Sequence, residues 1–121
     1  MPLLSDMSYD QEHHDKMVDA IRTVSTSLPQ TIELLAEAYV SEYAMMDVSD
    51  INDGCCYDFA NDLKSIFPKI NVSWIDELSQ EFSDIAHFVA FLDGKYYDAE
   101  VPFGVENLHD IPLIIRLVES D

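Results

Sequence analysis

Apolar and polar residues alternate at helical spacing in the first part of the chain. Ser8 and Gln11 stand three residues apart, which is the spacing of a capping box at a helix start. The residues that follow at helical intervals are Met17, Ile21, Val24 and Leu28. This pattern predicts a first helix that begins near Ser8.

The next apolar pattern predicts a second helix and then a third. Ser27 can cap the second helix, because serine is a favoured N-cap residue. Pro29 then lies in the first turn, where proline is tolerated. The apolar stripe of the second helix is Ile32, Leu35, Tyr39, Tyr43 and Met46. A loop over residues 47–54 then leads to a third helix from about Cys55 to Phe67, which Pro68 stops.

In the second half of the chain, apolar residues recur at the two-residue spacing typical of strands. Residues 70–74 alternate apolar and polar side chains, as a half-buried strand does. Two apolar or aromatic runs, residues 85–92 and 95–101, are separated only by Asp93 and Gly94. An Asp-Gly pair between two such runs predicts a β-hairpin with a two-residue turn.

The last apolar run, residues 110–119, fits two structures. Asp110 can cap a short helix that has Pro112 in its first turn, and residues 113–118 can equally form an edge strand. Helices that precede antiparallel strands indicate an α+β fold. The length of 121 residues fits a single domain, 1–121, with a helical N-terminal part at 1–49 and a core at 50–112.

Acidic residues outnumber basic ones by a wide margin. The chain has 24 aspartate and glutamate residues against 6 lysine and arginine residues, a formal net charge of −18. Such a surface repels nucleic acid and anionic membranes and attracts basic partners. Three interpretations stay open: a soluble self-repelling surface, an inhibitor that occupies the nucleic-acid channel of another protein, and an enzyme with a basic substrate.

Other sequence features indicate the cellular environment of the protein and whether it binds metal. The two adjacent cysteines cannot form a disulfide framework, which favours a reducing environment. The sequence shows no apolar run of membrane-spanning length and no signal peptide, so we expect a cytoplasmic protein. His13 and His14 lack the spacing of a zinc site and are interpreted as solvated helix residues. We expect no cofactor and no metal.

Cys56 lies where a reactive thiol is favoured. The predicted third helix begins at Cys55 or Cys56, just after Gly54, which allows the backbone to turn. The positive end of a helix dipole stabilises a thiolate, the nucleophilic form of cysteine. Cys56 shares a helical face with Ala60, whereas Cys55 is interpreted as a packing residue.

The predicted hairpin places a histidine beside two carboxylates. With a two-residue turn at 93–94, His87 lies opposite Glu100 and diagonal to Asp98, all on one face of the sheet. Either carboxylate can then fix the tautomer of the imidazole. Cys56, His87 and Asp98 have the residue types of nucleophile, base and orienting group, with Glu100 as an alternative orienting group.

These same segments resemble the papain-like and transglutaminase-like superfamily, in particular its small phage and bacterial members. GCCYDFA at residues 54–60 is similar to the helix start of these proteins, and HFVAFLDGKYYDAE at residues 87–100 is similar to their histidine strand, turn and next strand. VPFGV at 101–105 and LHDIP at 108–112 resemble the segment that follows. The resemblance covers roughly residues 50–112.

The resemblance implies a cysteine-bearing helix packed on a small antiparallel sheet, and thiol-dependent acyl chemistry of the peptidase, amidase, deamidase or transglutaminase type. By this match Cys56 is the nucleophile, His87 the base and Asp98 the third member. Papain-like enzymes place a side-chain amide ahead of the cysteine to help hold the oxyanion. Asn52 is the nearest such residue, at a spacing that departs from the papain one. The substrate would be a protein or peptide.

A second function class follows from the charge. Some members of the superfamily bind without catalysis, and an acidic protein of phage origin can inhibit a nucleic-acid-binding host protein by imitating nucleic acid, in the host cytoplasm. Such a protein binds neither nucleic acid nor membrane itself. Its complex should weaken as salt rises, because exposed charges are screened.

Overall fold

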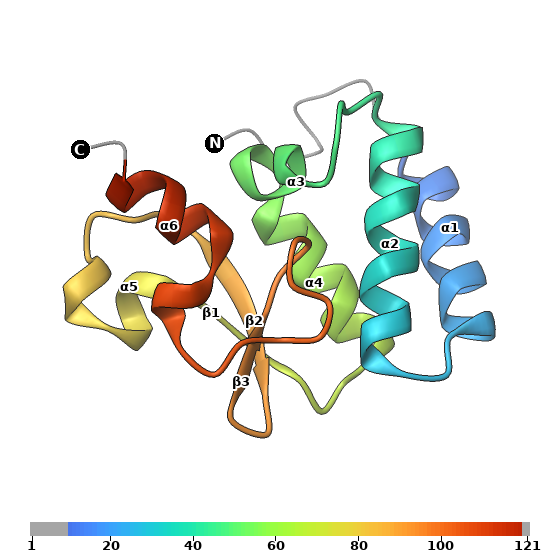
Figure 1. Cartoon of the computed structure of the whole chain (residues 1–121). Helices are drawn as coiled ribbons and strands as arrows, with labels where there is room; N and C mark the ends of the chain where they lie inside the picture. Colours follow the sequence, from blue (N-terminus) through green and yellow to red (C-terminus); the bar gives the residue numbers. More distant parts are fainter. Residues whose placement is uncertain (1–9, 120–121) are drawn as a thin grey trace.

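The computed structural model describes residues 10–119, in which helices surround a small antiparallel sheet (Figure 1). The helices are α1 (Gln11–Val24), α2 (Leu28–Glu42), α3 (Ser49–Gly54), α4 (Cys56–Ile66), α5 (Ile75–Leu78) and α6 (Pro112–Glu119), with short 3-10 turns η2 (Gln80–Phe82) and η3 (Leu108–Asp110). The sheet has the order β1 (Asn71–Trp74), β2 (Phe88–Leu92), β3 (Lys95–Tyr97). This arrangement confirms the α+β class.

The first two helices begin at polar caps, one of which differs from the prediction. The cap of α1 is Asp10, whose carboxylate accepts hydrogen bonds from the backbone amides of Glu12 and His13. Ser8 lies outside the described residues. Ser27 caps α2 as predicted, because its hydroxyl accepts from the amide of Gln30 at 3.3 Å.

The end of α2 and the segment after it were predicted incorrectly. The helix ends at Glu42, so Met46 is not part of its apolar stripe and is 93% exposed. The segment assigned to a loop contains the short helix α3, which buries Ile51 completely in the core. A stretch whose strongly apolar residues are only Val48 and Ile51 gives too little periodicity to indicate a helix.

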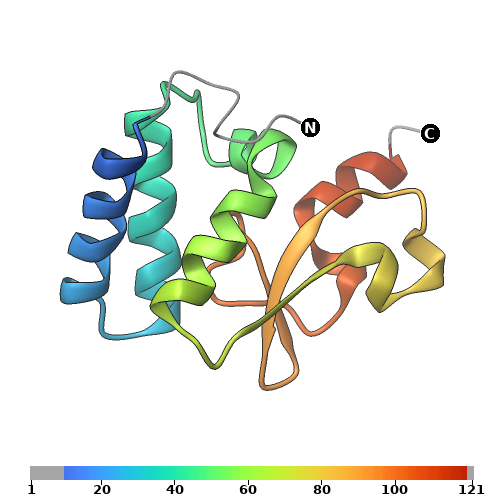
Figure 2. The same cartoon turned by 180° about the vertical axis from the view of Figure 1, so that it is seen from behind.

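The main core lies between the N-terminal helices, α4 and the sheet, and α4 stands between α2 and the strands (Figure 2). Its largest fully buried side chains include Ile32, Leu35 and Tyr39 of α2 and Phe59 and Leu63 of α4. Burying side chains of this size contributes roughly 1.5–3 kcal/mol each relative to exposure. The resulting packing fixes the axis of α4, and therefore the position of Cys56 at its start.

The interpretation of His14 as a solvated residue is wrong. His14 is 3% exposed, its Nε2 lies 2.6 Å from Asp62 on α4, and its Nδ1 lies 2.5 Å from the hydroxyl of Tyr43. Tyr39 also hydrogen-bonds Asp62. The pKa of His14 is raised, because its hydrogen bond to Asp62 and the charge of that residue outweigh burial, which lowers the pKa. His13, by contrast, is exposed and pairs with Glu42 at 2.7 Å.

The hairpin has the predicted register over its strands. Leu92 pairs with Lys95, and Ala90 pairs with Tyr97, around the turn at 93–94. Strand β3 ends at Tyr97, so the ladder does not continue to the positions opposite His87. Asp98 and Glu100 therefore belong to the loop after β3, and their positions depend on hydrogen bonds other than those of the ladder.

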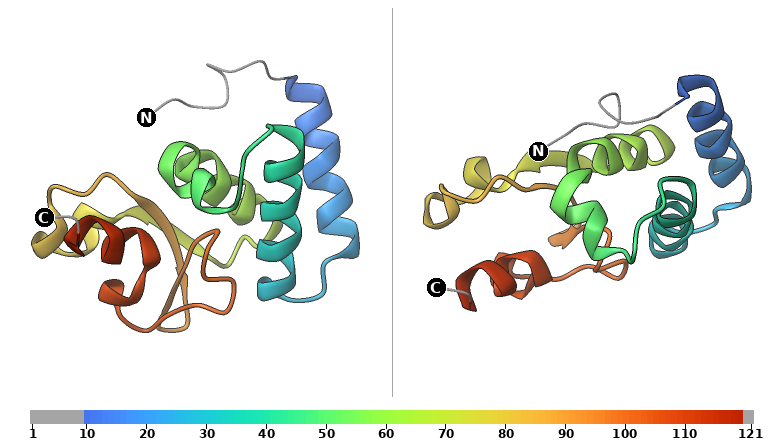
Figure 3. Two further views of the ribbon diagram at one scale, coloured as in Figure 1. Left: turned by 45° about the horizontal axis from the view of Figure 1, so that its top comes forward. Right: turned by 90° about the horizontal axis from the view of Figure 1, so that it is seen from above.

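The C-terminal run forms a helix rather than an edge strand. Pro112 is the first residue of α6, and Leu113 and Ile114 are buried in a second apolar cluster with Ile75 of α5 and Val89 of β2. The views in Figure 3 show α6 beside α3, at the end of the sheet away from α1 and α2. The tail thereby brings a C-terminal helix close to the start of α4.

Replacing Gly104 with alanine is expected to destabilise the fold by about 1–3 kcal/mol. Gly104 has a φ of +79°, and an added Cβ would lie 2.7 Å from the ring of Tyr97, next to Asp98. The free energy of unfolding in urea measures the effect. Gly54→Ala is the matched control, because that position has an ordinary φ and no atom within 4 Å of the added Cβ. An equal loss in both variants would contradict this account.

Candidate functional site

The two cysteines lie at the start of α4, and neither forms a disulfide. Cys56 is the first residue of the helix and packs in a small cluster with Ala60 and Phe88. Cys55 belongs to the main core, and burial, followed by the charges of Asp58 and Cys56, raises its pKa to about 11. Cys55 is therefore a packing residue, and Cys56 is the thiol at the positive end of the helix dipole.

Gly54 has no steric role at this helix start. Its φ is not in the left-handed region, and a Cβ there would meet no atom within 4 Å. The close succession of α3 and α4 depends instead on backbone bonds, including that from the amide of Cys55 to the carbonyl oxygen of Ile51 at 2.7 Å. The sequence-based expectation of a glycine-dependent turn is wrong.

His87 lies just before β2 and is completely buried. Its carbonyl oxygen accepts a hydrogen bond from the amide of Ile75 at 2.8 Å, which extends the pairing of β1 and β2 by one step. Its Nε2 lies 3.0 Å from Oδ2 of Asp98. Because an ionised carboxylate only accepts, Nε2 carries the proton, and Nδ1 is the ring nitrogen that remains for Cys56.

The two partners of His87 keep its ring protonated. Burial lowers the pKa of the imidazole, but the hydrogen bonds to Asp98 and Cys56, together with the charges of both, raise it to about 9. Nδ1 is the ring nitrogen not bound to Asp98, and it is the one available to Cys56. The arrangement favours an imidazolium beside the sulfur at neutral pH.

Asp98 is held from its other side by the loop that follows β3. Its Oδ1 accepts a hydrogen bond from the backbone amide of Glu100 at 2.9 Å, and the residue is 4% exposed. Both carboxylate oxygens are therefore occupied, one by the loop and one by His87. The structure thus assigns the contact with His87 to Asp98 rather than to Glu100.

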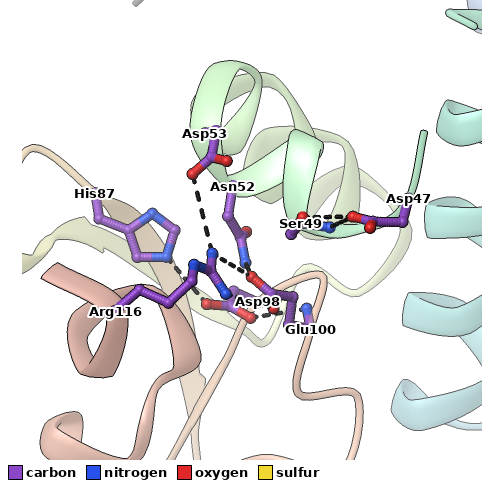
Figure 4. Close-up of polar contacts among 8 residues, drawn as sticks. All are labelled: Asp47, Ser49, Asn52, Asp53, His87, Asp98, Glu100 and Arg116. Atoms are coloured by element: carbon purple, nitrogen blue, oxygen red, sulfur yellow. Dashed lines mark hydrogen bonds and ion pairs between the residues drawn. The ribbon is translucent and has the colours of Figure 1, made fainter. Parts of the chain in front are cut away.

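Glu100 and Asn52 form a separate polar group next to the pair (Figure 4). The side-chain amide of Asn52 donates to Oε1 of Glu100 at 2.9 Å, whereas its Oδ1 is buried without a partner. Glu100 also binds Arg116 of α6 through two hydrogen bonds, at 2.8 and 2.9 Å. Sequence reasoning did not identify Arg116, because nothing local in a tail of ambiguous secondary structure indicates that contact.

The site is closed to solvent in this conformation. Cys56 is 2% exposed and His87 is not exposed at all. Beside them, the aromatic rings of Tyr57, Trp74 and Phe88 pack with centroid separations of 4.9–5.8 Å. A reagent or substrate therefore reaches the sulfur only when the elements around it move apart, and accessibility has to be measured together with reactivity.

Within residues 10–119, no group of three or more histidine, cysteine, aspartate or glutamate residues is arranged to hold a metal ion. No helix of that range has the length and apolar character needed to cross a membrane. No family model, curated protein or solved structure matches the chain. The case for a function therefore depends on the geometry of the site itself.

Proposed function

We propose that the protein is a small thiol enzyme of the papain-like or transglutaminase-like type, which hydrolyses or transfers the acyl group of an amide through Cys56. The observation that supports this most directly is the buried His87, bonded to Asp98 through Nε2 and influenced by Cys56 on its other side. This combination provides a nucleophile, a base and an orienting carboxylate.

The chemistry would proceed in two steps. The reactive form pairs the imidazolium with the thiolate, and the sulfur attacks the amide carbonyl to form a tetrahedral intermediate. His87 then gives its Nδ1 proton to the leaving amine as the carbon–nitrogen bond breaks, which leaves a thioester on Cys56. Water or a second amine, deprotonated by His87, attacks the thioester and releases the sulfur.

Two groups of the site support the transition state. Cys56 is the first residue of α4, and the backbone amides at a helix start are donors suited to an oxyanion. Asp98 carries the charge that stabilises the imidazolium throughout. The amide of Asn52 is bound to Glu100, so its part in holding an oxyanion stays a prediction.

Alkylation of Cys56 by iodoacetamide, followed against pH by tandem mass spectrometry, tests the proposal. We expect the labelling rate of Cys56 to fall at least about 10-fold in His87→Gln, because that variant removes the base beside the sulfur. Cys56→Ala reports any background at Cys55, and labelling in denaturant gives the rate of an accessible thiol. Slow labelling below pH 8 that is the same in His87→Gln would contradict the proposal.

The alternative of a binding protein that imitates nucleic acid stays a prediction from the net charge of −18. It differs from the enzyme proposal in one measurable way. Cys56→Ala would leave an inhibitory complex intact, whereas it would abolish acyl transfer.

A further inference from the structure

Arg116 connects the C-terminal helix to the candidate site. It lies on α6, and its guanidinium donates from Nη1 to Oε2 of Glu100 and from Nη2 to Oε1 of the same carboxylate (Figure 4). A paired contact of this kind fixes both the direction and the distance of the carboxylate. The side chain of Glu100 is only 14% exposed, so its orientation depends strongly on this partner.

Glu100 in turn contacts both Asp98 and Asn52. Its backbone amide holds Oδ1 of Asp98, the residue whose other oxygen binds His87. Its side chain accepts from Asn52 on α3, four residues before Cys56. A displacement of Glu100 would therefore also displace Asp98, which binds the imidazole. It would displace Asn52 as well, which lies on the helix that precedes the one carrying the thiol.

The charges around Arg116 agree with this connection. Its pKa is raised, first by the hydrogen bond to Glu100, against the opposing effect of burial, and then by the charges of Glu100, Asp53 and Asp98. Asp53 of α3 lies 3.9 Å from the guanidinium. Arg116 thus offsets negative charge on α3 and on the loop that carries Asp98. Without it, Glu100 would be a nearly buried carboxylate with no cation beside it.

We propose that Arg116 is a positioning residue for the thiol site: by fixing Glu100 it aligns Asp98 with His87 and holds the amide of Asn52 in place. This inference rests on the proposed function for its role in catalysis. The alignment itself is a property of the fold, which can be measured whether or not Cys56 reacts.

The Nε2–H proton of His87 is the most direct reporter of this alignment. In the wild type we expect a downfield proton resonance that exchanges slowly with water, because the proton is buried and bonded to Asp98. Arg116→Gln should speed its exchange at least about 10-fold. Arg116→Lys should fall between the two, because a lysine keeps the charge and cannot bridge both oxygens of a carboxylate.

Arg22→Gln is the matched control. Arg22 lies on α1 and pairs with Asp19, so it is not part of the Glu100 network. The variant therefore removes one positive charge, as Arg116→Gln does, but at a different place. Thermal unfolding and the exchange of backbone amides in β2 separate a local effect from a general loss of stability. Should Arg116→Gln fail to fold, Arg116→Lys carries the same test.

The outcomes distinguish this inference from the proposed function. An unchanged Nε2–H signal in folded Arg116→Gln would overturn the positioning role. A changed signal, together with a Cys56 that alkylates no faster than an ordinary thiol in the wild type, would support the positioning role and reject the enzyme. A reactive Cys56 whose alkylation falls in Arg116→Gln supports both.

Discussion

Replacing Asp98 with asparagine is expected to lower the alkylation rate of Cys56 near pH 7 by at least about 100-fold. Asp98 accepts two hydrogen bonds, one on each oxygen, from Glu100 and His87. Asparagine has a single acceptor oxygen, so one of these bonds is lost. The charge that keeps the imidazole protonated is lost as well, and burial then lowers the pKa of His87.

Asp93→Asn is the control for this variant. Asp93 lies in the hairpin turn with a φ of +52°, a conformation that asparagine adopts readily. The substitution removes one negative charge, as Asp98→Asn does. Circular dichroism and thermal unfolding verify that both proteins are folded. A folded Asp98→Asn protein with the alkylation rate of the wild type would show that the carboxylate has no part in activating the sulfur.

The contact between His87 and Asp98 could be predicted because it follows from local rules. An Asp-Gly turn sets the register of the hairpin, and that register places the histidine near the carboxylate that follows the next strand. The predicted contact is present even though β3 ends at Tyr97, because Asp98 is the next residue of the chain and precedes the turn over residues 98–101. The choice between Asp98 and Glu100 needed the structure, since both were on the predicted face.

The contacts that the sequence did not indicate are those between distant segments. His14 is buried because Asp62, 48 residues away, and Tyr43, 29 residues away, surround it. Arg116 reaches Glu100 from a helix that the sequence left ambiguous with a strand. Periodicity indicates which face of an element is apolar, but it does not indicate which polar residue of another element will lie against it.

Burial of the site has a consequence for both function classes. The sulfur and imidazole are closed to solvent, whereas the acidic residues are spread along a chain of charge −18. A thiol enzyme of this design would require local opening before each turnover, and the energy of that opening would reduce its rate. A binding protein would require no opening. Accessibility of Cys56 is therefore as informative as its reactivity.

The contribution of His87 to the free energy of unfolding is expected to fall by about 3 kcal/mol between pH 6 and pH 9. Its pKa is raised from 6.5 to about 9 in the folded protein. Between those values the folded state binds more protons than the unfolded state, so the stabilisation is fully present below pH 6.5 and is lost as the pH rises through 9. His14, whose pKa is also raised, acts in the same direction.

Urea titrations of the wild type and His87→Gln at pH 6, 7, 8 and 9 measure this effect. The variant should lose most of the pH dependence, and His13→Gln should retain it, because His13 is exposed and lies on α1. His14→Gln separates the smaller contribution of the Asp62 network. Cys55, whose pKa is raised to about 11, contributes only above pH 9. A stability difference between the wild type and His87→Gln that stays constant over this range would show that the raised pKa of His87 does not contribute to stability.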